Sequence, residues 1–537
     1  MLISRRAALQ AATGAALLAD GPQPASAQSR AETLRYVTGG NINTLDTTMP
    51  GATRESFGLG MNVYDRLFGF GRKRLGGNWT FDAKTIRGEL ARGYEMSPDG
   101  LKFLILLRPD ATWHDGSPVT AEDIKWSLDR AVSAKSLAPP QLSTGSLTSA
   151  DQFRIVDAHI IEVSLPKPDR LAVANLCVPY AIMINSRLAK QHATAEDPWA
   201  QEWTKANTAA GGAYMVESYR PGESAILRRN DAWKSGRDGQ LPSFRRIIVQ
   251  TVPEAATRAN LVERGDADLS IDLAASDIPT MEKAPKVKVV SVPQTNGFTH
   301  ITVNTQAAPF DNVKVRQAIA AALPYEDMFK AALFGRGAKL FGADWTGTPP
   351  DSSFPQPIPN KTDLARAKQL MAEAGMPDGF STAFAISAGQ AGTAEPVAAL
   401  LKEALARIGI RVEIQKKPDS EFNTMEAEKR LPFYIDGATA WLPATDYYFR
   451  LYFTRDQRWN FANWKSPAIE QLSSDARFET DAAKYEQDCT KMIEVFTAEV
   501  PLIMLWQPNH DAVMAASVDG YTYQFYRQAD FRDLKRI

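Results

Sequence analysis

A histidine and an aspartate stand side by side near the start of TWHDGSPVTAEDIKWSL, residues 112–128, and further acidic residues follow them. An imidazole held against a carboxylate can act as a general base, so His114 and Asp115 are candidates for hydrolytic chemistry. Such chemistry requires the two side chains to be held in an oriented contact, which sequence neighbours in a tight turn do not provide. The elements around the pair therefore decide between a catalytic and a structural role.

Those flanking elements favour a structural role. The run KFLILLR, residues 102–108, predicts a strand, and Asp115-Gly116 predicts a tight turn because glycine tolerates the positive φ of such turns. Thr120 then begins a helix with a capping box, in which the hydroxyl accepts a hydrogen bond from the amide three residues on. The acids of the first turn lie at the positive end of the helix dipole. We expect these acids to stabilise the helix and His114 to be structural.

The composition is typical of a globular protein. Of 537 residues, 44% are hydrophobic and 23% are charged, and the formal charge of −1 provides no bulk attraction for nucleic acid or an anionic membrane. The length predicts two or three domains. Two cysteines, Cys177 and Cys489, exclude a disulfide-rich scaffold and a four-cysteine metal site. One bridge between them and two independent buried thiols both stay open.

Residues 1–27 predict a signal peptide. Arg5 and Arg6 precede an apolar stretch that is too short to span a bilayer, and the small residues of PASA, residues 24–27, fit a signal peptidase. The run SRRAAL, residues 4–9, resembles the twin-arginine export motif. Ordinary secretion also stays open, because Ala8 replaces the usual aromatic residue. We expect the mature chain to begin near Gln28, to leave the cytoplasm and to be soluble.

Strand and helix signals alternate along the chain. The segment ALLKEALARIGIRVEIQ, residues 399–415, predicts a helix that ends before Gly409 and is followed by a strand. Residues 362–379 predict another helix, which ends at Gly375. The proline-rich residues 347–360 predict an extended loop. This alternation is typical of an α/β protein.

Several segments together resemble one family. WHDGSPVTAEDIKWSLDR, residues 113–130, resembles a signature of the family 5 extracellular solute-binding proteins, which serve ABC importers of oligopeptides, dipeptides, nickel complexes and related solutes. Similar stretches follow in order over most of the mature chain, namely GGAYMVESYRPGESAILRRNDAW (211–233), LVERGDADL (261–269) and VNTQAAPFDNVKVRQAIAAAL (303–323). The chain departs from the family pattern at Ala213, where a proline is usual.

The resemblance implies an α/β fold with two lobes, the type II periplasmic-binding-protein clamshell, with an extra subdomain in lobe I. The expected divisions are 28–72, 203–294 and 504–537 for lobe I, 73–202 for its extra subdomain, and 295–503 for lobe II. The chain would cross between the lobes within residues 294–304 and return near residues 500–505. Ligand would bind between the lobes and bias a hinge motion toward closure.

The resemblance also places candidate ligand-binding residues on both lobes. Lobe I would contribute the loop VTGGNINTLD, residues 37–46, where glycine allows close backbone approach and an amide offers a donor and an acceptor. Lobe II would contribute aromatic rings for apolar groups and a charged group for a charged end, with core packing as the alternative for each ring. The candidates are Gly40, Asn41, Phe298, Trp345, Trp441, Asp446 and Tyr447, with Arg450 as an alternative to Asp446.

One departure from the family bears on the substrate. Peptide-binding members carry an aspartate shortly after the tryptophan that corresponds to Trp441, and this aspartate pairs with the terminal amine of the peptide. Here Pro443 and Ala444 lie close to that position, and Asp446 is displaced by two residues. A buried amine without a partner is unfavourable. An opine, a modified amino acid, a glycoside or another small organic solute therefore becomes an alternative to a short peptide.

No cofactor and no metal is expected, because the five histidines lack ligand-type spacing. A secreted hydrolase is the main alternative function, although the chain lacks the Gly-x-Ser-x-Gly, His-Glu-x-x-His and phosphate-loop motifs. A binding protein with a sensor or chaperone role is another alternative. The preferred interpretation is a monomeric periplasmic protein without enzymatic activity, which captures a short peptide or small organic solute and delivers it to an ABC permease in the inner membrane.

Overall fold

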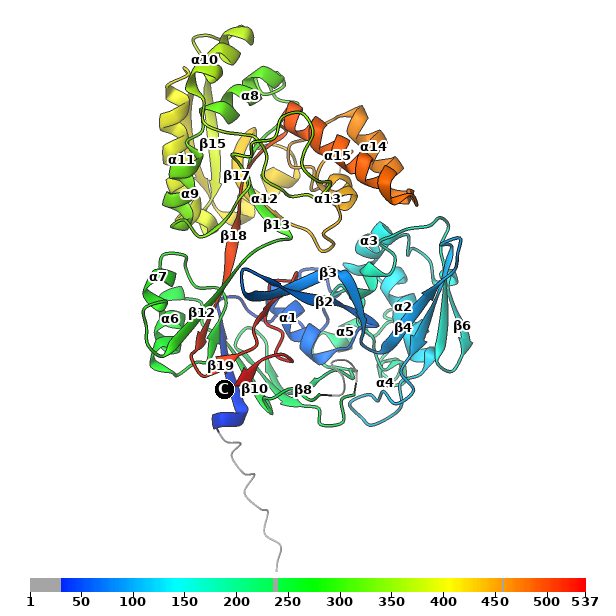
Figure 1. Cartoon of the computed structure of the whole chain (residues 1–537). Coiled ribbons are helices and arrows are strands. Elements are labelled where there is room, and N and C mark those ends of the chain that lie inside the picture. Colours follow the sequence, from blue (N-terminus) through cyan, green and yellow to red (C-terminus); the bar gives the residue numbers. More distant parts are fainter. Residues whose placement is uncertain (1–29, 235–239, 456–457) are drawn as a thin grey trace, which may run out of the picture.

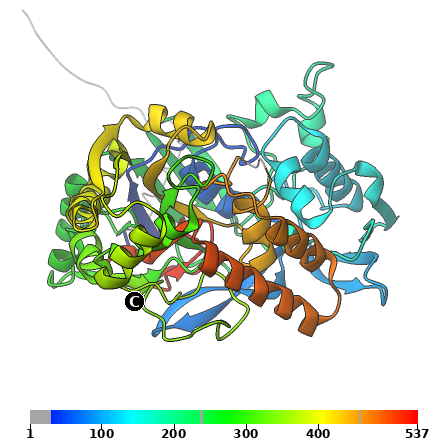
Figure 2. The ribbon, with the colours of Figure 1, turned by 90° about the horizontal axis from the view of Figure 1, so that it is seen from above.

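The computed structural model describes residues 30–234, 240–455 and 458–537, so the predicted signal peptide, residues 1–27, lies outside the described residues. The described chain forms two α/β lobes, an upper and a lower one in Figure 1. The cyan segment with helices α2 (Ala121–Ser133) and α3 (Ala138–Leu142) extends to one side of the molecule in both views (Figure 1, Figure 2). This is the two-lobed clamshell that the sequence predicts.

One continuous sheet joins the lobes, with strands in the order β16-β15-β17-β13-β18-β11-β1-β10-β9-β8 and with β12 and β14 also paired to β18. The strands of the lower lobe are β1 (Thr33–Thr38), β8 (Tyr214–Arg220), β9 (Ser224–Arg229), β10 (Arg246–Thr251), β11 (Leu269–Ser270) and β12 (Val287–Pro293). Those of the upper lobe are β13 (Gly297–Val303), β14 (Gly337–Lys339), β15 (Ser381–Ser387), β16 (Arg411–Lys417) and β17 (Phe433–Thr439).

Strand β18 (Leu502–Ala515) belongs to both lobes. Its residues 502–506 pair with β13 in the upper lobe, and its residues 509–515 pair with β12 in the lower lobe. The other connection is short, because β12 ends at Pro293 and β13 begins at Gly297. Short connections of this kind are where hinge closure between two lobes takes place.

Smaller sheets and the helices complete the two lobes. The sheets are β2 (Phe68–Leu75), β3 (Asn78–Gly88) and β20 (Thr522–Tyr523); β4 (Ala91–Met96), β5 (Lys102–Leu107), β7 (Ile160–Ser164) and β6 (Phe153–Asp157); and β19 (Val518–Asp519) with β21 (Lys535–Arg536). The remaining helices are α1 (Arg54–Val63), α4 (Ser186–Lys190), α5 (Gln201–Thr204), α6 (Ala255–Arg264), α7 (Ile278–Met281), α8 (Val313–Ala322), α9 (Tyr325–Leu333), α10 (Leu364–Glu373), α11 (Ala391–Ala406), α12 (Asp419–Ala427), α13 (Thr445–Tyr452), α14 (Pro467–Phe478) and α15 (Ala482–Glu499).

The helix ends that glycine predicts are confirmed. α10 is followed by Gly375 at φ +76°, and α11 by Gly409 at φ +82°. Both are left-handed backbone conformations, which glycine adopts without a steric penalty. The strand predicted after Gly409 is β16, and the strand predicted from KFLILLR is β5.

The start of α2 confirms the capping box. The Thr120 hydroxyl accepts from the Asp123 amide at 3.3 Å, and the Asp123 carboxylate accepts from the Thr120 amide at 3.1 Å. Asp123 is buried, and its carboxylate also accepts from the Trp113 indole at 3.1 Å and from the amide and hydroxyl of Ser186 at 3.0 and 2.7 Å. This carboxylate therefore joins the helix start to two other segments.

Replacing Asp123 by alanine is expected to lower the free energy of unfolding by about 2 kcal/mol, because buried donors lose their acceptor. Chemical denaturation followed by tryptophan fluorescence measures the change. The matched control is Glu122→Ala in the same helical turn, where the side chain is exposed and the expected change is within about 0.5 kcal/mol. Equal losses of stability in both variants would show that these acids stabilise the protein through the helix dipole and not through the hydrogen-bond network of Asp123.

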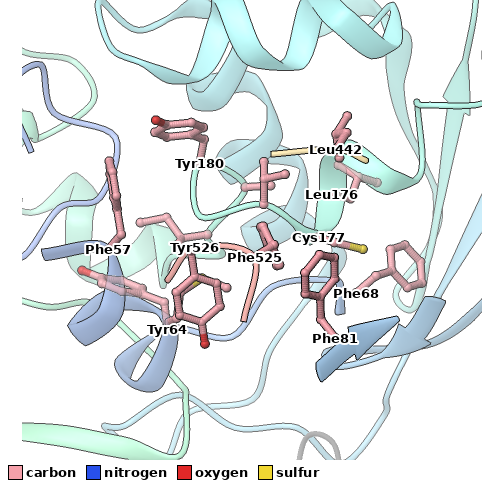
Figure 3. Packing of buried hydrophobic residues seen from close by; sticks show 14 of the residues in the cluster. Phe57, Tyr64, Phe68, Phe81, Leu176, Cys177, Tyr180, Leu442, Phe525 and Tyr526 are labelled. Carbon is pink, nitrogen blue, oxygen red and sulfur yellow. The ribbon is translucent and has the colours of Figure 1, made fainter. Parts of the chain in front are cut away.

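Buried aromatic and sulfur-containing side chains from distant segments form the core of the lower lobe. Phe68, Phe81, Cys177 and Phe525 pack together there, and Leu442 of the upper lobe belongs to the same cluster (Figure 3). The two lobes are therefore in apolar contact. Both cysteines of the chain are buried free thiols, which selects independent thiols over a bridge.

Candidate ligand-binding site

A cavity of about 840 Å³ lies between the lobes. The lower lobe contributes Arg54, Tyr180 and Arg527 to its wall, and the upper lobe contributes Phe298, Asp436, Trp441, Tyr447 and Trp459, among others. A second cavity of about 550 Å³ adjoins the first, since both are lined by Arg54, Gln294, Leu333, Gln390, Thr393, Pro508 and Arg527. Their volumes are those of pockets that enclose small organic ligands.

Three of the predicted ligand-binding residues line the first cavity, namely Phe298, Trp441 and Tyr447. Phe298 lies at the start of β13, Trp441 follows β17, and Tyr447 lies on α13. The Tyr447 hydroxyl donates to Gln141 of α3 at 3.1 Å and so bridges the two lobes. The other four candidates, which are Gly40, Asn41, Trp345 and Asp446, are not among the described residues that line either cavity.

The loop that contains Gly40 and Asn41 supports the start of α1. A Cβ at position 40 would lie 2.4 Å from the Glu55 carboxylate, so glycine makes room for that side chain. The carbonyl of Asn41 accepts from the hydroxyl of Thr53, the N-cap of α1, at 2.6 Å. The loop thereby positions Arg54, the first residue of α1, which does line the cavity.

The carboxylate of Asp446 accepts hydrogen bonds from two other side chains. Arg450 donates to it from Nε and Nη2, each at 3.2 Å, and the Tyr485 hydroxyl donates at 2.8 Å. Asp446 is 0% exposed. The carboxylate therefore joins α13 to α15. Trp345 is half-buried, and its indole donates to the carbonyl of Pro357 at 3.0 Å within the proline-rich loop.

Trp441 lies against three aromatic rings of the lower lobe. Its ring centroid is 5.5 Å from that of Phe57, 5.4 Å from that of Tyr180 and 6.1 Å from that of Phe525, and all three contacts are edge-to-face. Edge-to-face pairs stabilise by about 1 kcal/mol each beyond the area they bury. Trp441 is therefore both a wall of the cavity and a contact that holds the lobes together.

The charged residues that line the first cavity are predominantly positive in the described chain, whereas three arginines and three acidic residues line the second. Arg54, Arg458 and Arg527 face one carboxylate, Asp436, in the first cavity. Asp436 accepts a hydrogen bond from Gln390 at 2.8 Å. Behind it, burial and the neighbouring Asp436 raise the pKa of Glu426 to about 9, so Glu426 is protonated and neutral near pH 7.

Among the described residues, no group of three or more histidine, cysteine or acidic side chains could hold a metal ion. Among the described helices, none combines the length and the apolar character needed to cross a bilayer.

The family model of the bacterial extracellular solute-binding proteins, family 5 middle, matches residues 85–460. The chain belongs to this family. Over 447 residues this family 5 protein is 24% identical to the probable D,D-dipeptide-binding periplasmic protein DdpA of Escherichia coli, and the match covers 82% of each chain.

Solved structures share the fold of this family 5 protein. DppA from Helicobacter pylori, in complex with the peptide STSA, gives a TM-score of 0.75 at 22% identity, over 94% of this chain and 98% of that one. AgaA from A. tumefaciens R10, in complex with agropinic acid, gives 0.74 at 22% identity, over 94% and 99%. The family and these structural neighbours are binding proteins.

Sequence reasoning missed several lining residues of this family 5 protein. Arg54, Tyr180, Gln294 and Arg527 come from four distant segments, and only the fold brings them together. One signal was available, because Arg54 directly follows the helix cap Thr53. A cation is unfavourable at the positive end of a helix dipole, so an arginine at that position indicates a function other than stability.

His114 lies outside both cavities of the family 5 protein. Its Nε2 contacts the carbonyl of Gly212 at 3.0 Å, and burial lowers its pKa to about 4. The adjacent Asp115 carboxylate accepts instead from the Ser117 amide and from the Asn185 side chain, each at 2.9 Å. The two side chains thus contact other groups and not each other, which supports the structural interpretation of His114.

Replacing His114 by alanine is expected to change solute affinity by less than about twofold and to lower the free energy of unfolding by about 1 kcal/mol, because only the Gly212 contact is lost. Calorimetric titration and chemical denaturation measure the two quantities. A large loss of affinity at unchanged stability would overturn this assignment and reinstate His114 as a functional residue.

Proposed function

We propose that this family 5 protein is the periplasmic solute-binding component of an ABC importer, and that its solute binds in the cavity between the lobes. The observation that carries the proposal is a cavity of about 840 Å³ whose walls come from both lobes, beside a hinge made of β18 and the β12–β13 connection. A solute that contacts both walls favours closure. The neighbouring structures with a peptide and with agropinic acid support binding of a small solute.

Within this proposal, Phe298, Trp441 and Tyr447 contact the solute directly. Gly40, Asn41 and Asp446 act indirectly, the first two through the start of α1 and the third through the packing of α13 on α15. The protein acts as a monomer without enzymatic activity, exported and soluble, and it delivers the solute to a permease. The lobe boundaries expected from the sequence are part of the proposal.

We further infer that the solute is not a peptide held by its free amine at Asp446. That carboxylate already accepts from Arg450 and Tyr485, and Ala444 lies close to the position of the family aspartate. A peptide amine placed there would be buried without an anionic partner, which is unfavourable. A small organic solute such as an opine, a modified amino acid or a glycoside is therefore the favoured class.

Uptake into membrane vesicles tests the importer role. Vesicles that carry the cognate permease are expected to accumulate the solute released from the protein only when the ligand-loaded protein and ATP are present. The solute should be recovered chemically unchanged. Conversion of the solute by the protein would instead support a hydrolase, and saturable binding without any uptake would support a sensor or chaperone role.

A further inference from the structure

Two arginines lie at the junction of the two cavities without a carboxylate partner in the described part of the chain. Arg54 and Arg527 line both cavities. Arg527 donates from Nη1 to the neutral amide oxygen of Gln294 at 3.2 Å. Nη1 of Arg54 and Nε of Arg527 are buried, and neither atom has a hydrogen-bond partner among the described residues.

Other buried arginines of this protein have acceptors. Four of them pair with carboxylates, and these pairs are Arg66 with Glu89, Arg130 with Asp46, Arg258 with Asp272, and Arg532 with both Glu89 and Asp530. Arg316 donates instead to the backbone carbonyls of Phe310 and Glu499. Arg54 and Arg527 are half-buried, and each has one buried nitrogen without an acceptor in the described chain. Such a nitrogen is unfavourable, so these two arginines differ from the five just named.

The two guanidinium groups also act on each other and on a third polar group. Burial lowers the pKa of Arg54 to about 9, and the charge of Arg527 adds to this effect. Burial lowers the pKa of His510 to about 3, with Arg527 and Arg54 contributing, so this imidazole is neutral. Its Nε2 is buried without a partner among the described residues and lines the second cavity. With a pKa of about 9, Arg54 remains charged near pH 7, and burial also lowers the pKa of Arg527.

The acids that line the second cavity form no ion pair with Arg54 or Arg527 in the described chain. These acids are Glu55, Asp272 and Asp511, of which Asp272 is paired with Arg258 at 3.0 Å and Asp511 with Arg336 at 2.8 Å. Glu55 attracts both guanidinium groups electrostatically without an ion-pair contact in the described chain, while burial raises its pKa. The N-terminus of α1 adds further positive potential at Arg54. The two arginines with the single acid Glu55 therefore give the junction a net positive charge, and the junction faces both cavities.

We propose that Arg54 and Arg527 together bind an anionic group of the solute, so that the solute is a small organic acid whose carboxylate or phosphate lies at the junction of the cavities. Guanidinium groups bind both anions through two parallel hydrogen bonds. The rest of the solute then lies against Trp441 and Tyr180 in the first cavity. This inference rests on the proposed function and narrows its solute class.

Two anions serve as probes on protein that has been stripped of solute by unfolding and refolding. Citrate represents a carboxylate and inorganic phosphate represents a phosphate, each titrated at constant ionic strength and followed by tryptophan fluorescence. At least one of them should bind the wild-type protein saturably. Arg54→Gln and Arg527→Gln should each weaken that binding by roughly a hundredfold, as expected when one partner of a buried charge pair is removed.

The matched control is Arg264→Gln, which removes a positive charge from the exposed end of α6, away from the described lining of both cavities. It should change the affinity for either anion by less than about threefold, because solvent screens the charge. Folding is monitored by the melting temperature of the stripped proteins. That temperature should stay the same or rise in Arg54→Gln and Arg527→Gln, since each change relieves an unpaired buried charge.

Three results would overturn the inference. The first is failure of both anions to bind the wild-type protein, and the second is equal weakening of anion binding in Arg264→Gln and Arg527→Gln. The third is the identification, by mass spectrometry, of a released solute that is neutral or purely cationic and that rebinds. The last result would leave the importer proposal intact, whereas chemical conversion of the solute would contradict that proposal instead. Methyl esterification and phosphatase treatment of the released solute distinguish a carboxylate from a phosphate.

Discussion

Replacing Trp441 by alanine is expected to weaken solute binding by roughly a hundredfold while both lobes stay folded. The indole forms part of the cavity wall and also lies edge-to-face against Phe57, Tyr180 and Phe525 of the other lobe. Its removal takes away contact with the solute and weakens the closed arrangement of the lobes. Because Trp441 is half-buried and follows β17 in a loop, the strand itself should be unaffected. Calorimetric titration with the solute released from wild-type protein measures the loss.

Trp345→Ala is the matched control for this change. Trp345 is also a half-buried tryptophan outside the helices and strands, but it does not line either cavity among the described residues. The expected change in affinity is less than about threefold, since only packing within the proline-rich loop is altered. Equal losses of affinity in the two variants would mean that Trp441 has no special role, and that the cavity wall has been assigned incorrectly.

The second large effect concerns stability. Glu89→Ala is expected to lower the free energy of unfolding by about 4 kcal/mol, because it leaves the buried Arg66 without its carboxylate and Arg532 with only one of its two, Asp530. Glu89 accepts from Arg66 at Nε, 3.1 Å, and from Arg532 at 3.1 Å, and the Arg66 and Glu89 side chains are 4% and 9% exposed. Arg532 belongs to the C-terminal segment, so the network also fixes that segment to the lower lobe. Chemical denaturation measures the change.

The control is Glu217→Ala, which removes the exposed partner of Arg246 at 2.9 Å. Exposed ion pairs contribute about 0–1 kcal/mol, so its stability should change little. A loss of less than about 1 kcal/mol in Glu89→Ala would contradict the assignment of the network as a buried one.

The same carboxylate gives the protein a pH dependence of known sign. Burial alone would raise the pKa of Glu89, but Arg66 and Arg532 outweigh it and hold the pKa below its ordinary value. Its contribution to stability is therefore complete above the unfolded value of about 4.3 and is lost as the pH falls through the lower folded pKa. Glu89→Gln should remove this part of the acid dependence, and an unchanged slope of stability against pH below about 4.3 would refute its origin in Glu89.

Local rules predicted the elements of the fold well. The capping box at Thr120 and the stops at Gly375 and Gly409 depend on a few neighbouring residues, and each is present in the structure. The pairing of Asp446 with Arg450 could also have been predicted from the sequence, because the two residues are four apart on a helix. That spacing favours an internal ion pair over a contact between Asp446 and a ligand.

The site could be predicted from the sequence only in part. Trp441, Tyr447 and Phe298 were accessible through the resemblance to the family, and the structure places all three at the cavity. Arg54 and Arg527 stand almost at opposite ends of the chain, and their proximity depends on how the C-terminal segment returns to the lower lobe. No local pattern in the sequence encodes this proximity.

The central claim is that a single small solute is captured between the lobes at Trp441. It is tested most directly by mass spectrometry of the molecules released on denaturation from wild-type protein and from Trp441→Ala, both purified from the periplasm of expressing cells. The account predicts one small anionic species, close to equimolar with the wild-type protein and strongly depleted in the variant. A heterogeneous ladder of peptides, or equal amounts of one species from both proteins, would contradict it.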